Sequence, residues 1–230
     1  MESLKIPKAV FFDWDGTLVD TLQGLRRSHN HVRVTLGYPS WSEEQFHSNL
    51  KHSARELYPA VYGEKSDEAL ALLYDYVDTH HLGHLQVLPG AADLLATLKN
   101  LGIACGIVSN KRHEFLLKEI KHLGWGDYVQ AAVGAGVAAR DKPAGDPIVH
   151  ALSLAGLKPD KATVWYAGDT ETDLLAAQDA GCAPVLLSHG KKKENLIETH
   201  NPLFVFGDCA EFKIYLNEIF CQSGSDIQRA

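Results

Sequence analysis

The stretch FFDWDGTLVD, residues 11–20, is the most informative part of this 230-residue sequence. Apolar residues run directly into two carboxylates, Asp13 and Asp15, which are separated by one residue and followed by a Gly-Thr turn. At the end of an extended strand, residues two apart point the same way, so both acids are expected to face one site. Carboxylates that close repel each other unless a cation neutralises them. The pattern therefore favours a functional site over a solvated turn.

Beyond residue 88 the sequence repeats a unit of helix, glycine and short apolar strand. The expected helices end at Gly102, Gly124, Gly156 and Gly181. The first expected strand, residues 9–12, precedes this region, and the others cover residues 103–108, 128–133, 163–167 and 184–187. Strands that are apolar on both faces and alternate with amphipathic helices indicate a parallel sheet covered on both sides. We therefore predict an α/β protein with a Rossmann-like parallel sheet, whose ligands bind at the carboxyl ends of the strands.

Residues 21–87 interrupt this alternation and show only helical patterns. Apolar residues have helical spacing over residues 22–36, and residues 42–45 (SEEQ) have the pattern of a capping box. No strand pattern is found in this stretch. We predict an α-helical cap domain of residues 21–87, inserted into an α/β core domain of residues 1–20 and 88–230.

Composition and charge argue against several classes of function. The chain has 22 basic and 29 acidic residues, a net charge of -7, which argues against binding nucleic acid through its phosphates. No apolar run approaches the roughly 20 residues that span a bilayer, and the first residues lack the apolar stretch of a signal peptide. The four cysteines have no metal-type spacing and suit a reducing compartment. We expect a cytoplasmic protein without a nucleic-acid or membrane partner, either a monomer or a homodimer.

Three further polar segments follow expected strands. Residues 109–111 (Ser-Asn-Lys) place a hydroxyl and an amide where a helix is expected to begin, which suits an oxyanion. Residues 141–143 (Asp-Lys-Pro) place a lysine just before a helix. Residues 168–173 place one acid, Asp169, at a strand end and another, Asp173, one helical turn later. Each segment alone has an ordinary structural explanation, such as a helix cap or a surface lysine. Their common location at strand ends indicates one shared site.

Together these motifs resemble those of the haloacid dehalogenase (HAD) superfamily, most of all its phosphatases with an inserted helical cap, such as phosphoglycolate phosphatases. The matching segments, in the family's order, are residues 13–17, 109–110, 142–143 and 168–173. The resemblance extends over essentially the whole chain. It implies a Mg²⁺-dependent phosphatase that hydrolyses a small phosphate monoester, a small phosphorylated metabolite, through an aspartyl-phosphate intermediate.

The resemblance also implies a role for each matching residue. Asp13 would be the nucleophile, and Asp15 would protonate the leaving alkoxide and then deprotonate water. Ser109, with Asn110 beside it, would bind a phosphoryl oxygen, and Lys142 would neutralise the nucleophile and the transferring group.

The same resemblance implies a set of metal ligands. The expected Mg²⁺ ligands are the carboxylate of Asp13, the backbone carbonyl of Asp15, the carboxylate of Asp169, and Asp173 directly or through a water. A carboxylate that attacks a phosphate dianion meets electrostatic repulsion, which the metal and the nearby lysine would offset.

Specificity is expected to depend on the cap. Lys51 and Arg55 lie between the capping-box helix and the next one, where related caps place a substrate loop, and both suit an anionic substrate. The ordinary alternative is a solvated helix face. The run Lys191–Lys193 is most simply a solvated loop.

Several other functions share part of this pattern. A sugar-phosphate mutase would retain both Asp13 and Asp15, and only its products would distinguish it. A phosphonatase would use a cap lysine as a Schiff base, which Lys51 permits, but an acid at position 15 counts against it and against a dehalogenase. A phosphate-binding protein without catalysis is disfavoured because the whole set of polar residues is present.

Overall fold

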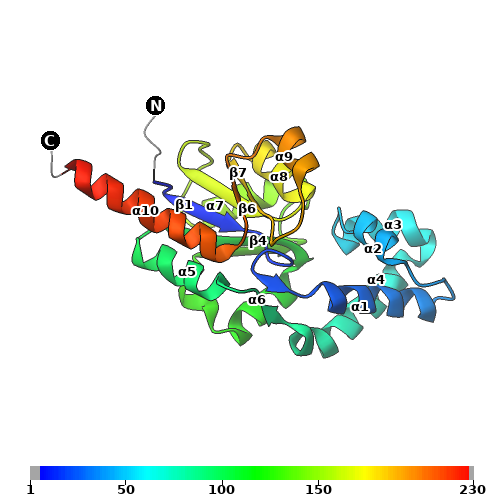
Figure 1. Cartoon of the computed structure of the whole chain (residues 1–230). Coiled ribbons are helices and arrows are strands. Elements are labelled where there is room, and N and C mark those ends of the chain that lie inside the picture. The colour runs from blue at the N-terminus through cyan, green and yellow to red at the C-terminus, as the bar shows by residue number, and fades with distance from the viewer. Residues whose placement is uncertain (1–5, 228–230) are drawn as a thin grey trace.

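The computed structural model describes residues 6–227 and contains a six-stranded parallel sheet (Figure 1). Its strands are β1 (Ala9–Phe12), β4 (Ala104–Arg112), β5 (Ala131–Ala135), β6 (Val164–Gly168), β7 (Ala183–Leu187) and β8 (Phe204–Phe206), in the order β5-β4-β1-β6-β7-β8. Strand β1 therefore lies between β4 and β6, and the chain adds strands first on one side of it and then on the other. The predicted α/β fold class with a parallel sheet is confirmed.

Helices cover both faces of the sheet because β1 is apolar on both sides. Val10 and Phe12 belong to the core cluster that also contains side chains of three helices, α5 (Ala91–Asn100), α6 (His113–His122) and α10 (Cys209–Ile227). Ala9 and Phe11 belong to a second cluster, with α7 (Asp146–Leu154) and α8 (Glu171–Asp179). Burial on both faces fixes the register of β1, since a shift by one residue would exchange the two sets.

The helical insertion, residues 21–87, forms a lobe beside the sheet, seen at the right of Figure 1 in blue and cyan. It contains α1 (Leu22–Thr35), α2 (Glu43–Asn49), α3 (Ala54–Tyr62), α4 (Ser66–His80) and two 3₁₀ turns, η1 (Gly63–Lys65) and η2 (His81–His84). The predicted capping box is confirmed, because Ser42 accepts a hydrogen bond from the Gln45 amide and the Gln45 side chain accepts one from the Ser42 amide. Val32, Tyr58 and Leu73 are among the residues of its core, which Phe115 of α6 joins.

Two short strands connect the insertion to the sheet. Strands β2 (Val19–Asp20) and β3 (Gln86–Val87) pair in antiparallel fashion, so the chain leaves and returns side by side. The expectation of no strand within residues 21–87 is therefore wrong at its last two residues, because a segment this short has no readable alternation. The division between a domain of residues 1–20 and 88–230 and a domain of residues 21–87 stays a prediction.

Other element boundaries also differ from those expected. The strand expected at 128–133 is observed as β5, after a 3₁₀ turn η3 (Trp125–Asp127). Strand β4 does not end at Val108 but reaches Arg112, which pairs with Ala135 after a register shift. The apolar pattern stops at Val108 although the backbone pairing continues, so the expectation that a helix opens at Ser109 is wrong. The last elements, α9 (Glu194–His200), β8 and α10, had no sequence prediction.

None of the helices within residues 6–227 is long and apolar enough to cross a membrane.

A buried histidine in the insertion makes stability depend on pH. His29 is 6% exposed, its Nδ1 lies 2.9 Å from the Tyr58 hydroxyl, and burial lowers its pKa to about 4. Below the ordinary pKa of histidine, this side chain is protonated in the unfolded chain but stays neutral in the folded one. The free energy of unfolding therefore decreases as the pH falls from neutral toward acid.

We expect the free energy of unfolding to fall more in the wild type than in His29→Gln on acidification, by about 2 kcal/mol between about pH 7.5 and about pH 5. Urea unfolding followed by circular dichroism measures both values. An equal loss in the two proteins would show that His29 is not the titrating group.

Candidate active site

The candidate residues meet at the carboxyl ends of β1, β4 and β6, where the strand order reverses direction. A cleft of about 1450 Å³ opens there beneath the insertion. Its lining includes all the core candidates and both insertion candidates, namely Asp13, Asp15, Ser109, Asn110, Lys142, Asp169, Asp173, Lys51 and Arg55. Residues up to 160 positions apart in the sequence are thus brought to one place, because parallel strands end at the same edge.

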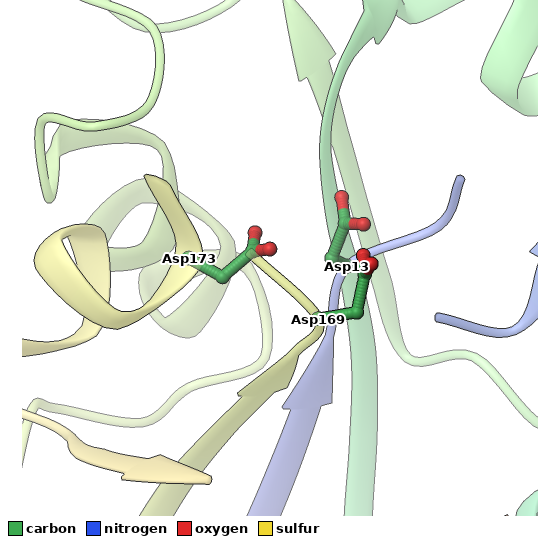
Figure 2. Close-up of side chains that lie close together, drawn as sticks. All are labelled: Asp13, Asp169 and Asp173. Atoms are coloured by element: carbon green, nitrogen blue, oxygen red, sulfur yellow. The ribbon is translucent and has the colours of Figure 1, made fainter. Parts of the chain in front are cut away.

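Three carboxylates form the centre of the site. Asp13, Asp169 and Asp173 each offer an oxygen within 4.8 Å of the others, and each residue is at most 6% exposed. Figure 2 shows the carboxyl groups of Asp13 and Asp169 side by side at the ends of β1 and β6, with Asp173 pointing toward them from α8. Carboxylate oxygens at this spacing suit a hard divalent cation.

The electrostatics of these acids fit the same interpretation. Burial raises the pKa of Asp13 to about 8, against the opposing effect of Lys142. Burial and the neighbouring charge of Asp173 raise the pKa of Asp169. Such shifts express the free energy needed to keep several buried carboxylates charged together, which a cation among them would reduce.

Two glycines allow the acids to approach so closely. A Cβ on Gly168 would lie 2.3 Å from the Cβ of Asp173, and a Cβ on Gly16 would lie 2.9 Å from an Asp169 oxygen. Gly16 also has a positive φ of 90°, which L side chains rarely adopt. The Asp173 carboxylate in addition accepts hydrogen bonds from the amide and hydroxyl of Thr170, so it caps α8 while it faces the site.

Lys142 is the buried cation of the site. Its Nζ donates to Asp13 and to Asp173, at 2.7 Å in each case, and to the Tyr166 hydroxyl at 2.9 Å. Burial alone would lower the pKa of Lys142, but the two carboxylates raise it well above its usual value. Asn110 accepts from the Lys142 amide and donates to the Lys142 carbonyl, so its side chain holds the lysine backbone.

Ser109 and Asp15 also line the cleft. Ser109 is buried in the last part of β4, and its Oγ accepts from the Lys111 amide at 3.1 Å. The Asp15 carboxylate accepts from the Lys111 ammonium at 2.7 Å and from the Thr21 hydroxyl, and it lies outside the group of three carboxylates. The predicted Asp15 metal ligand is its backbone carbonyl, and proton transfer by its carboxylate stays a prediction.

Sequence reasoning missed several side chains of the site. Thr17 donates to Asp13 at 3.2 Å and contacts Asp169 at 3.4 Å. The Lys193 ammonium contacts both the backbone carbonyl and the carboxylate of Asp169, and its side chain is 13% exposed. The expectation that Lys191–Lys193 is simply solvated is therefore wrong for Lys193, because a lysine run does not reveal which member turns inward. Thr17 had a signal, since it belongs to the first motif.

The two insertion candidates contact the core. Arg55 donates from Nε and from one terminal nitrogen to the two carboxylate oxygens of Asp141, at 2.6 and 2.8 Å. Lys51 pairs with Glu171 at 3.0 Å. Arg55 thus joins the insertion to a buried carboxylate of the core, whereas Lys51 forms a surface pair and is 59% exposed. The predicted contact of both residues with substrate stays a prediction.

The sequence matches the haloacid dehalogenase-like hydrolase family over residues 10–187. The chain belongs to this family. It is 31% identical over 197 residues to the phosphoglycolate phosphatase of Chromobacterium violaceum, covering 82% of this chain and 88% of that one. It is also 31% identical over 233 residues to the phosphoglycolate phosphatase of Rhodospirillum rubrum, covering 96% and 95%. The family predicted from the four motifs is confirmed.

Solved structures of other haloacid dehalogenase-like proteins share the fold. A HAD-superfamily hydrolase from Ehrlichia chaffeensis aligns with a TM-score of 0.65 at 26% identity, covering 94% of this chain and 99% of that one. A haloacid dehalogenase-like hydrolase from Streptococcus pneumoniae aligns with a TM-score of 0.77 at 23% identity, covering 91% and 98%.

The Arg55–Asp141 pair should contribute measurably to stability. Because Arg55 is partly exposed and Asp141 is buried, we expect Arg55→Ala and Asp141→Asn each to lower the free energy of unfolding by roughly 1–2 kcal/mol. The double variant should lose little more than either single one, because both changes remove the same interaction. Urea unfolding of the four proteins measures this coupling.

Arg26→Ala is the matched control, because its 3.7 Å pair with Glu43 is exposed on both sides. It should change stability by less than about 0.5 kcal/mol. Strict additivity of Arg55→Ala and Asp141→Asn would contradict a pair that holds the insertion on the core.

Proposed function

We propose that this protein is a Mg²⁺-dependent phosphatase that hydrolyses a small phosphate monoester through an aspartyl-phosphate on Asp13. The observation that carries the proposal is the buried cluster of Asp13, Asp169 and Asp173, in which Asp13 and Asp173 accept hydrogen bonds from the Lys142 ammonium. The chain is a phosphoric monoester hydrolase of the haloacid dehalogenase-like family, and relatives that are 31% identical are named phosphoglycolate phosphatases.

The donor set suits the proposed metal. The carboxylates of Asp13, Asp169 and Asp173 and the backbone carbonyl of Asp15 would hold Mg²⁺, which prefers oxygen ligands. Bound there, the ion would neutralise charge on the carboxylates and on the phosphoryl oxygens.

Asp13 would act as the nucleophile. Its Oδ1 accepts from Lys142 and its Oδ2 from Thr17, so the carboxylate is fixed in orientation at the strand end. A carboxylate oxygen of Asp13 forms a bond to phosphorus while the bond from phosphorus to the ester oxygen breaks. Lys142 reduces the repulsion between the attacking carboxylate and the substrate dianion.

Asp15 would transfer the protons. In the first step its carboxylic acid gives a proton to the departing ester oxygen, and the resulting carboxylate then takes a proton from the water that attacks the phosphorus of the intermediate. The hydrogen bonds from Lys111 and Thr21 orient the Asp15 side chain for both steps. Ser109, with its hydroxyl at the end of β4, would bind a phosphoryl oxygen.

The contacts of Lys51 weigh against phosphonatase chemistry. A Schiff base needs a neutral amine, whereas the ammonium of Lys51 pairs with Glu171 at 3.0 Å and is 59% exposed. The substrate we propose is therefore a phosphate ester of a small metabolite, as in the named relatives. The cytoplasmic location and the monomeric or homodimeric state stay predictions.

A phosphate-release assay tests the proposed function. The wild type with Mg²⁺ should release phosphate from at least one of phosphoglycolate, glycerol phosphate and p-nitrophenyl phosphate. Chelation should abolish release, added Mg²⁺ should restore it, and Ca²⁺ should restore it poorly because its coordination shell is larger and looser.

Asp13→Asn is the control for the site, because an amide is nearly isosteric but is no nucleophile. It should lower turnover by at least about a thousandfold while circular dichroism stays unchanged. Full activity after thorough chelation would contradict the metal, and turnover of Asp13→Asn within about tenfold of wild type would contradict the nucleophile.

A further inference from the structure

A buried carboxylate behind the cleft belongs to none of the motifs of the family. Glu119 of α6 is 0% exposed, and both of its oxygens accept hydrogen bonds. Oε2 accepts from Trp14 Nε1 at 2.6 Å and from Lys111 Nζ at 2.6 Å, and Oε1 lies 2.8 Å from His81 Nδ1. Burial would raise the pKa of Glu119, but the bonds from His81 and Lys111 hold it below its usual value. The residue is thus a fully enclosed carboxylate.

Lys111 connects this carboxylate to the site. Its Nζ lies between Glu119, at 2.6 Å, and Asp15, at 2.7 Å, and its side chain is 4% exposed. A lysine chain has four rotatable carbons, so one carboxylate partner does not fix it. Two carboxylate partners restrict the position of the ammonium, and with it that of the Asp15 carboxylate.

The same cluster contacts both connections to the insertion. His81 begins η2, the turn that leads into β3, and Thr21, which donates to Asp15, directly follows β2. A displacement of either connection would therefore alter a hydrogen bond of the cluster. Buried ion pairs contribute little to the net free energy of unfolding, because the cost of desolvation offsets their attraction. Stability alone therefore does not account for the pairs that Lys111 forms with Glu119 and Asp15.

We propose that Glu119 is a positioning residue that holds Lys111 against Asp15. His81, which contacts Glu119, links this arrangement to the insertion. The inference rests on the proposed function, in which Asp15 transfers protons. Glu119 touches neither substrate nor metal in this account and acts only through Lys111.

The leaving group distinguishes this role from a general structural one. An alkyl phosphate, such as glycerol phosphate, needs a proton from Asp15 as its ester bond breaks, whereas p-nitrophenolate leaves without one. The value of kcat/KM reports the steps up to this bond cleavage. Glu119→Gln removes the charge that holds Lys111 and keeps the shape of the side chain.

We expect Glu119→Gln to lower kcat/KM by about 10- to 100-fold for glycerol phosphate and by no more than about threefold for p-nitrophenyl phosphate. Lys111→Met should show the same contrast, and the double variant should lose little more than Lys111→Met alone, because the two residues act in series. Glu218→Gln, the same change on an exposed face of α10, should leave both substrates unaffected.

His81→Phe keeps an aromatic ring against Phe115 and gives a second test, should Glu119→Gln not fold. It should show the same contrast between the two substrates at about two- to fivefold.

The outcomes distinguish failure of the positioning role of Glu119 from failure of the proposed phosphatase function. Equal losses on both substrates, or additive losses in the double variant, would overturn the inference while the phosphatase activity of the wild type stands. No phosphate release by the wild type from any substrate would overturn the proposed function and this inference with it.

Discussion

The site depends on the balance of charge between the buried carboxylates and the buried Lys142 ammonium. Asp13 and Asp173 both accept a hydrogen bond from Lys142, and Asp169 stands next to them with little exposure to solvent. Carboxylates that lie this close together and are buried from solvent repel each other, and burial disfavours their charged forms. Lys142 contacts Asp13 and Asp173, Lys193 contacts Asp169, and the proposed metal would supply further positive charge among the three carboxylates. The same positive charges attract the phosphate of a substrate, so the constraint that shapes the site also selects its ligand.

The fold supplies the geometry that this balance needs. Because β1 lies between β4 and β6, three strand ends deliver their polar residues to one point. Gly16 and Gly168 remove the side-chain bulk that would keep Asp169 and Asp173 apart from their neighbours. The insertion lines the cleft and contacts the core through Arg55 and Lys51, so it contributes to the walls around the charges.

The sequence predicted the parts of the site that occur in ordered motifs. Asp13 and Asp169 were predicted because polar residues that end apolar strands stand out, and Lys142 because it lies in a matching segment just before a helix. The structure brings the three together. The fold class was predicted for a similar reason, because buried parallel strands have an unbroken apolar pattern.

Other residues could not be found from the sequence because their neighbours in space decide their role. Tyr166 lies in an apolar strand and resembles an ordinary core residue, yet its hydroxyl contacts Lys142. Glu119 lies on α6, where an acid normally faces solvent, and only the packing of Trp14 and Lys111 against it shows that it is enclosed. Lys193 is one of three consecutive lysines, and the turn of the loop alone determines which one enters the site.

The most direct test of the central claim is to trap the covalent intermediate. In Asp15→Asn, p-nitrophenyl phosphate with Mg²⁺ should still phosphorylate the enzyme, because its leaving group needs no proton, while hydrolysis of the intermediate is slowed. Reduction of the quenched protein with borohydride converts an acyl phosphate on aspartate to homoserine, which peptide mass spectrometry locates. Homoserine is expected at position 13, with Asp169 and Asp173 unchanged. Homoserine at another aspartate, or none while p-nitrophenol is released in a burst, would contradict it.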